Sequence, residues 1–90
     1  MSTPNKDTGA AFRRVTGALD AHHAAQGTTG RGADRAGWTM YCCTAHPDRN
    51  PSLGIKHDAA QGKAVVRCFA GCPDTAVLDT LGLEISDLYD

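Results

Sequence analysis

The stretch CTAHPDRNPSLGIKHDAAQGKAVVRCFAGC, from Cys43 to Cys72, decides the fold of this 90-residue chain. Two residues separate Cys43 from His46, and three separate Cys68 from Cys72. Such short spacings let a tight turn present two side chains to one metal ion, and a hairpin between the turns would bring them together. Three thiolates and one imidazole complete the tetrahedral shell of a structural zinc site. The stretch therefore predicts one structural zinc ion, held by Cys43, His46, Cys68 and Cys72.

Two other chemistries compete for the four cysteines of the chain. A disulfide framework is disfavoured because the N-terminus lacks the apolar stretch of a secretory signal, so we expect a reducing cytoplasm. It would also leave His46 without a role. A nucleophilic cysteine is disfavoured because the thiols occur in pairs and no single thiol stands out beside a partner base.

The neighbouring residues Cys42 and Cys43 are alternatives for the first metal ligand. On a strand they would point to opposite faces, so we expect only one of them to reach the metal. Cys43 is favoured because its spacing to His46 is the tighter one. Cys42 is then expected to be a small, partly buried apolar residue. The spacing alone leaves this choice open.

Three segments predict a small antiparallel sheet. Trp38–Cys43 is rich in aromatic residues and predicts the first strand, whereas Ser52–His57 alternates and predicts the second. Lys63–Cys68 predicts the third strand, joined to the second by a loop of hairpin length. With only five aromatic residues in 90, the chain can bury a thin core, so a stabilising metal is expected.

Helical patterns flank the predicted sheet. Phe12, Val15 and Leu19 have the i, i+3, i+7 spacing of an amphipathic helix. Pro73 suits the first turn of a second, short helix that ends at Gly82. The predicted fold is a small α+β domain, with a three-stranded antiparallel sheet flanked by an N-terminal helix and a short C-terminal helix. Its expected parts are a disordered lead over 1–7, a helix over 8–26, a flexible glycine-rich loop over 27–37 and a zinc-binding domain over 38–90.

Beyond the ligand spacing, the order of several motifs resembles a known family. The motifs are CTAH at 43–46, DRNPSL at 48–53, VRCFAGC at 66–72, VL at 77–78 and LGL at 81–83. Together they resemble the Cys-His-Cys-Cys zinc-binding domain of bacterial and phage DNA primases, over about residues 37–89. The three-residue gap between the last two cysteines is similar to the phage and plasmid branch. Thr44 departs from the pattern, because the family usually has proline there.

The resemblance implies a function in DNA replication. In that family the domain is a zinc ribbon that helps a primase choose its start site on single-stranded template DNA. Single-stranded DNA is therefore the expected partner, in the cytoplasm of a bacterial host cell. A replication protein such as a helicase or a primase catalytic chain is a further candidate partner. Primer synthesis needs clustered carboxylates that hold magnesium, so we expect no synthesis by this chain alone.

Residue patterns add candidate DNA-binding positions to this resemblance. Alternation along the second and third strands predicts that Lys56, Lys63 and Arg67 share one exposed face. Arg49 follows the first pair of predicted ligands and would lie near the metal. Aromatic side chains near a basic face can stack on nucleic acid bases. The candidates for stacking are Trp38, Tyr41 and Phe69.

Charge and hydropathy set the limits of this interpretation. The formal net charge is −1, and residues 73–90 carry five acidic residues and no lysine or arginine. No apolar run is long enough to span a membrane. His22 and His23 are expected to be solvated on the N-terminal helix.

Two alternatives to a stand-alone DNA-binding function stay open. One is a primase subunit or fragment that acts with a separate catalytic chain. The other is a zinc-stabilised adapter for protein partners that does not bind DNA.

Overall fold

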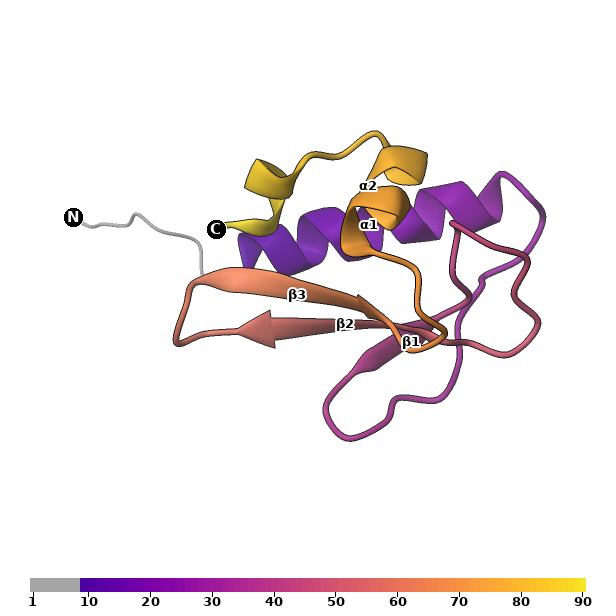
Figure 1. The fold of residues 1–90 in the computed structure, drawn as a ribbon, viewed down its shortest axis with the longest axis horizontal. Coiled ribbons are helices and arrows are strands. Elements are labelled where there is room, and N and C mark those ends of the chain that lie inside the picture. Colours follow the sequence, from indigo (N-terminus) through magenta and orange to yellow (C-terminus); the bar gives the residue numbers. More distant parts are fainter. Residues whose placement is uncertain (1–8) are drawn as a thin grey trace.

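The computed structural model describes residues 9–90, so the predicted disordered lead over 1–7 lies outside the described residues. The elements follow in the order α1 (Ala10–Ala24), β1 (Thr39–Tyr41), β2 (Leu53–Asp58), β3 (Lys63–Cys68), α2 (Asp74–Leu81) and a 3-10 turn η1 (Ile85–Leu88). Figure 1 shows the two helices on the same side of the sheet. The element order confirms the predicted α+β class: along the chain, an N-terminal helix precedes the three-stranded antiparallel sheet and a short C-terminal helix follows it.

The sheet has the strand order β1-β2-β3, and both pairs of strands are antiparallel. The register pairs Ile55 with Val66 and Lys56 with Val65. Since paired residues share a face and neighbours alternate, Ile55 and Val66 lie on the inner face, toward the helices. Lys56 and Arg67 lie on the opposite face, which we call the outer face. The predicted common face of Lys56, Lys63 and Arg67 agrees with this register.

The apolar core lies between the inner face and the helices. From α1 it receives Val15 and Leu19, both fully buried, while Phe12 lies at the edge of the core. From α2 it receives Val77 and Leu78. The helix α1 therefore shares one core with the sheet, because the apolar stripe of an amphipathic helix must be buried against another element. Among residues 9–90, no helix combines the length and the apolar character that crossing a bilayer requires.

The two ends of the described chain meet at the start of α1. Gly9 is the N-cap residue and has no side chain with which to cap the helix. The carboxylate of Asp90 replaces that cap, because it accepts the backbone N–H groups of Gly9 at 3.1 Å and of Ala11 at 2.8 Å. Arg14 of the same helix donates to the carbonyl of Asp87 at 2.6 Å. These contacts fix the acidic C-terminal segment against α1.

The loop between α1 and β1 runs along the free edge of the sheet. Gly32 N–H donates to the carbonyl of Met40 at 3.0 Å, and Cys42 N–H donates to the carbonyl of Gly30 at 2.7 Å. These bonds satisfy backbone groups of an edge strand that would otherwise face water or another chain. The flexibility expected of residues 27–37, and the division of the chain into domains, stay predictions.

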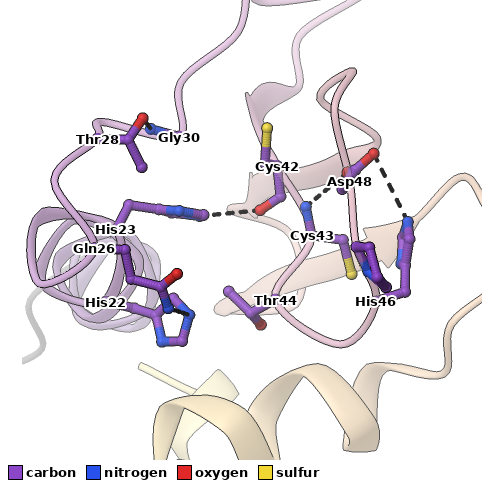
Figure 2. Close-up of a pocket in the computed structure, with 11 residues that line it drawn as sticks. His22, His23, Gln26, Thr28, Gly30, Cys42, Cys43, Thr44, His46 and Asp48 are labelled. Carbon is purple, nitrogen blue, oxygen red and sulfur yellow. Dashed lines mark hydrogen bonds and ion pairs between the residues drawn. The ribbon is translucent and has the colours of Figure 1, made fainter.

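The C-terminal end of α1 is anchored by His23 (Figure 2). Its Nε2 lies 3.0 Å from the carbonyl oxygen of Cys42, and the ring is buried. The prediction that His23 is solvated is therefore wrong. His23 follows Leu19 by four residues and so continues the buried stripe of the helix, a spacing that the sequence contains. A hollow of about 320 Å³ separates this helix end from the turn after Cys43.

Candidate metal centre

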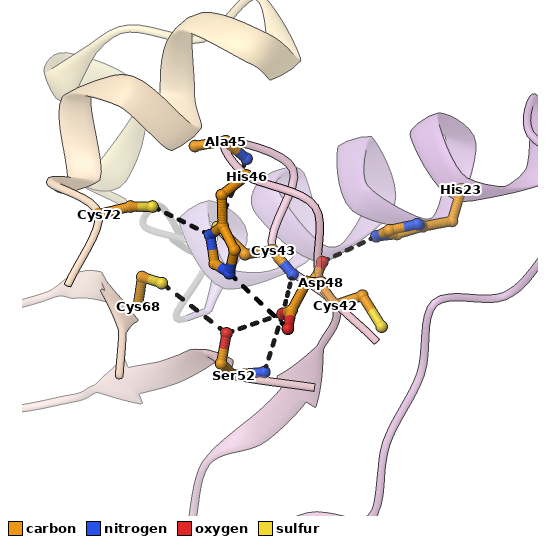
Figure 3. Close-up of polar contacts among 9 residues, drawn as sticks. All are labelled: His23, Cys42, Cys43, Ala45, His46, Asp48, Ser52, Cys68 and Cys72. Atoms are coloured by element: carbon orange, nitrogen blue, oxygen red, sulfur yellow. Dashed lines mark hydrogen bonds and ion pairs between the residues drawn. The ribbon is translucent and has the colours of Figure 1, made fainter. Parts of the chain in front are cut away.

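The four predicted ligands come together at one end of the sheet (Figure 3). Cys43 and His46 lie just after β1, and Cys68 and Cys72 lie at the end of β3 and in the turn that follows. One ligand atom from each residue lies within 4.8 Å of every other. The β2–β3 hairpin produces this meeting, because it returns the chain to the end of β1. A Cys-His-Cys-Cys cluster of this size is compatible with one structural metal ion.

Cys43, rather than Cys42, contributes its sulfur to the cluster. Figures 2 and 3 show the Cys42 sulfur pointing away from His46 and from the other thiols. Burial, and then the nearby charge of Asp48, raise the pKa of the Cys42 thiol, so its uncharged form is favoured. Of the two candidates for the first ligand, the structure therefore favours Cys43. Cys42 is a half-buried small residue.

The turn from Cys68 to Cys72 is shaped to stabilise a thiolate. Gly71 has a φ of +111°, a conformation that favours glycine, and its N–H donates to the carbonyl of Cys68 at 3.1 Å. Burial acts to raise the pKa of the Cys68 thiol. Hydrogen bonds to the sulfur from the backbone N–H groups of Cys72 and Ala70, together with those from the side chains of Ser52 and Cys43, outweigh burial and lower the pKa to about 7.

The other two thiols need a cation before they ionise readily. Burial raises the pKa of Cys43 to about 12. Burial, followed by the neighbouring Cys68, also raises the pKa of Cys72. A divalent metal reverses this trend, since a coordinating thiol loses its proton outright. Three sulfurs and one imidazole nitrogen are a donor set that zinc prefers, and with four protein ligands the shell is closed.

A second group of candidate residues gathers on the outer face. Trp38 and Phe69 meet edge to face, with ring centroids 5.4 Å apart. The ammonium of Lys56 lies 5.3 Å from the centre of the Trp38 ring, and the guanidinium of Arg67 lies 5.0 Å from that of Phe69. Phe69 is 46% exposed. We call these four residues, Trp38, Lys56, Arg67 and Phe69, the aromatic–basic face.

Gly54 lies beneath the two rings of the aromatic–basic face. A Cβ atom at this position would come within 2.8 Å of the Trp38 ring and 3.0 Å of the Phe69 ring. Glycine is therefore needed here because the rings pack directly on the strand backbone. This residue is buried, so it serves the packing of Trp38 and Phe69 and offers no surface of its own to a ligand.

Two other predicted positions lie apart from the aromatic–basic face. Lys63 shares the outer face but stands at the opposite end of β3 from Arg67, and its ammonium lies 4.9 Å from the centre of the Tyr89 ring. Arg49 is exposed in the turn that leads from the metal cluster to β2. The structure therefore brings together four of the seven predicted DNA-binding residues. Their role in binding stays a prediction.

Tyr41 corrects the set of stacking candidates. Its side chain is only 1% exposed, because β1 turns it toward α1. The hydroxyl donates to the carboxylate of Asp20 at 2.8 Å, and the ring stacks on His23 with centroids 6.2 Å apart. A base cannot reach a ring that is already enclosed. Tyr41 is therefore a core residue that joins β1 to α1.

The buried phenol predicts a loss of stability at alkaline pH. Burial, the hydrogen bond to Asp20 and the charge of that carboxylate raise the pKa of Tyr41 from 10.0 to about 12. The contribution of the neutral phenol to folding stability is fully present below pH about 10 and is lost as pH rises toward 12. The reason is that the phenol has the lower pKa in the unfolded state and therefore loses its proton there first. We expect Tyr41→Phe to cost about 1 kcal/mol near pH 7. Melting curves should also show a smaller alkaline loss for Tyr41→Phe than for the wild type; equal losses would contradict this assignment.

Comparison with known proteins adds no family to these observations. No protein family model, curated protein or solved structure matches this chain. The structure by itself supports a small domain that carries a Cys-His-Cys-Cys cluster suited to zinc. A relation to DNA primases rests on the motifs of the sequence.

Proposed function

We propose that this chain is a zinc-stabilised module that binds single-stranded DNA through the aromatic–basic face, as the template-recognition domain of a DNA primase does. The motifs between Cys43 and Cys72 support the relation to primases. In this proposal the zinc ion is structural, because four protein ligands leave no coordination position for a substrate. The metal joins the end of β1 to the end of β3 and so fixes the strands that carry the binding residues.

The composition of the aromatic–basic face is the observation that carries the proposal. Proteins that bind single strands combine aromatic rings, on which bases stack, with cations that follow the phosphates. Here Trp38 and Phe69 supply the rings, and Lys56 and Arg67 stand beside them within about 5 Å. The acidic residues of the segment 73–90 lie in or next to α2 and η1, and both of these elements pack against α1.

In primer synthesis, the contribution of this chain would be template binding. Catalysis would then come from a separate chain that holds the magnesium ions. This division of roles distinguishes a stand-alone DNA-binding protein from a primase subunit. Primer synthesis by a candidate catalytic chain, measured with and without this protein, separates the two.

The C-terminal segment favours the alternative of a protein-binding adapter. Ile85 and Tyr89 are 43% and 49% exposed, and both lie within the acidic segment 73–90. Exposed apolar patches rimmed by polar residues mark interaction surfaces, and a charged surface favours a partner of opposite charge. An adapter of this kind would keep the zinc and the fold but would not bind DNA.

A salt titration of DNA binding distinguishes the proposal from the adapter. We expect the zinc-loaded chain to bind a fluorescent single-stranded oligonucleotide at low salt, as measured by anisotropy. The logarithm of the affinity should fall linearly with the logarithm of salt concentration, with a slope of about −1.4 for two phosphate contacts. Lys56 and Arg67 supply those two contacts. No binding at low salt, or binding insensitive to salt, would contradict the proposal.

A further inference from the structure

The carboxylate of Asp48 lies at the centre of a hydrogen-bond network beside the metal cluster (Figure 3). Its Oδ2 accepts the backbone N–H of Cys43 at 2.7 Å, the backbone N–H of Ser52 at 3.2 Å and the hydroxyl of Ser52 at 2.7 Å. Only 9% of the Asp48 side chain is exposed. The carboxylate therefore holds the backbone of one predicted ligand and the start of the segment that leads into β2.

The other carboxylate oxygen of Asp48 faces a second predicted ligand. Its Oδ1 lies 3.7 Å from Nε2 of His46. The opposite ring nitrogen, Nδ1, points to the cluster and lies 3.0 Å from the sulfur of Cys72. The ring of His46 is therefore oriented with Nδ1 toward the metal position and Nε2 toward Asp48.

A third predicted ligand is reached through Ser52. The hydroxyl that donates to Asp48 also lies 3.8 Å from the sulfur of Cys68. Asp48 is thus connected to Cys43 directly, to His46 across a short gap and to Cys68 through one hydroxyl. A turn-capping role alone would explain the bonds to the two backbone N–H groups, but not the position of Oδ1 beside the imidazole.

We propose that Asp48 is the positioning residue of the metal centre, and that it makes His46 bind zinc through Nδ1. The proposal rests on the proposed zinc site. A carboxylate beside Nε2 favours the tautomer that keeps its proton on Nε2, so the lone pair remains on Nδ1. It also fixes the ring and increases the basicity of the ligand, and loss of such an outer partner typically weakens metal affinity 10- to 100-fold.

Asp48→Asn separates this role from turn capping. The amide oxygen can accept the same three bonds from Cys43 and Ser52. The amide nitrogen would then face Nε2 of His46 as a donor, which favours the tautomer with its proton on Nδ1, the wrong one for binding. We expect zinc affinity, measured by competition with a chromophoric chelator, to fall about 10- to 100-fold. Asp34→Asn, which removes an equal charge from an exposed ion pair with Arg31, should leave the affinity unchanged.

Nitrogen-15 NMR of His46 in the zinc-loaded wild type gives an independent readout. We expect Nδ1 to carry the metal shift and Nε2 to carry a proton, and the opposite arrangement would overturn the proposal even if Asp48→Asn fails to fold. Binding through Nε2, or equal zinc affinity in wild type and Asp48→Asn, would overturn the role of Asp48 but leave the zinc site intact. Absence of zinc binding by the wild type would overturn both.

Discussion

Removal of zinc by a chelator is expected to unfold the sheet of this protein. Cys43 and Cys68 belong to the buried core and lie just after β1 and at the end of β3, so loss of the metal removes the link between these two chain segments. Structural zinc contributes about 10–16 kcal/mol of apparent binding free energy in small zinc domains. The whole folding stability of a typical domain is about 5–15 kcal/mol. The metal can therefore account for most of the stability of a 90-residue chain with a thin core.

Circular dichroism and amide hydrogen exchange measure this loss directly. After chelation we expect the cooperative melting transition to disappear and the amides of residues 38–72 to exchange rapidly. Addition of zinc should restore both signals, whereas magnesium should not, because hard cations prefer oxygen ligands. A chelated sample that keeps the melting temperature of the zinc-loaded protein would show that the hydrophobic core suffices without metal.

Replacement of the stacking rings is expected to remove most of the DNA affinity. Alanine substitution of a ring that stacks on a base costs about 1–3 kcal/mol, or roughly 5- to 150-fold in affinity. Phe69→Ala is the cleaner variant, because the Phe69 ring is nearly half exposed whereas Trp38 is more deeply buried. Both variants uncover part of Gly54, so a melting curve of each variant separates lost stacking from a local change in the sheet.

Ile85→Ala is the matched control for these variants. Ile85 is a similarly exposed apolar residue, but it lies on η1, outside the aromatic–basic face. Its loss should leave anisotropy titrations with the oligonucleotide unchanged. If Phe69→Ala binds as tightly as the wild type, the outer face is not the binding surface. If Ile85→Ala alone weakens binding, the acidic segment has the role proposed here for the sheet.

Local patterns were sufficient to predict the metal cluster and the hairpin. The spacing from Cys43 to His46 and from Cys68 to Cys72 predicts the two turns that carry the ligands. The alternation in β2 and β3 predicts which side chains share a face, and the observed register agrees with it. Each of these features depends on residues close in sequence. For the same reason the common face of Lys56 and Arg67 could be predicted before the structure was known.

The faces of β1 could not be predicted by alternation. Met40 and Tyr41 point to opposite faces, yet both are about 1% exposed. Trp38 and Phe69 help to enclose Met40 on the outer face, and α1 covers Tyr41 on the inner face. A strand buried on both faces has no polar residues to mark its solvent side. The sequence pattern therefore predicted an exposed Tyr41 ring, whereas packing against distant residues encloses it.

Contacts between distant parts of the chain also could not be predicted from local sequence patterns. Asp90 caps α1 across 79 positions, and no local pattern marks a residue as the cap of a helix so far away. Asp48 lies inside the recognised motif, but its contacts to three predicted ligands depend on how the turn folds around the metal position. These positions are determined by tertiary structure, which local spacing does not encode.

The metal content of three purified proteins tests the central claim most directly. We predict about one zinc per chain for the wild type and for Cys42→Ser, measured by elemental analysis, because one four-residue cluster holds one ion. Cys43→Ser should lose the zinc or bind it much more weakly. A wild type without zinc, or a pair of variants in which Cys42→Ser loses the metal and Cys43→Ser keeps it, would contradict the account.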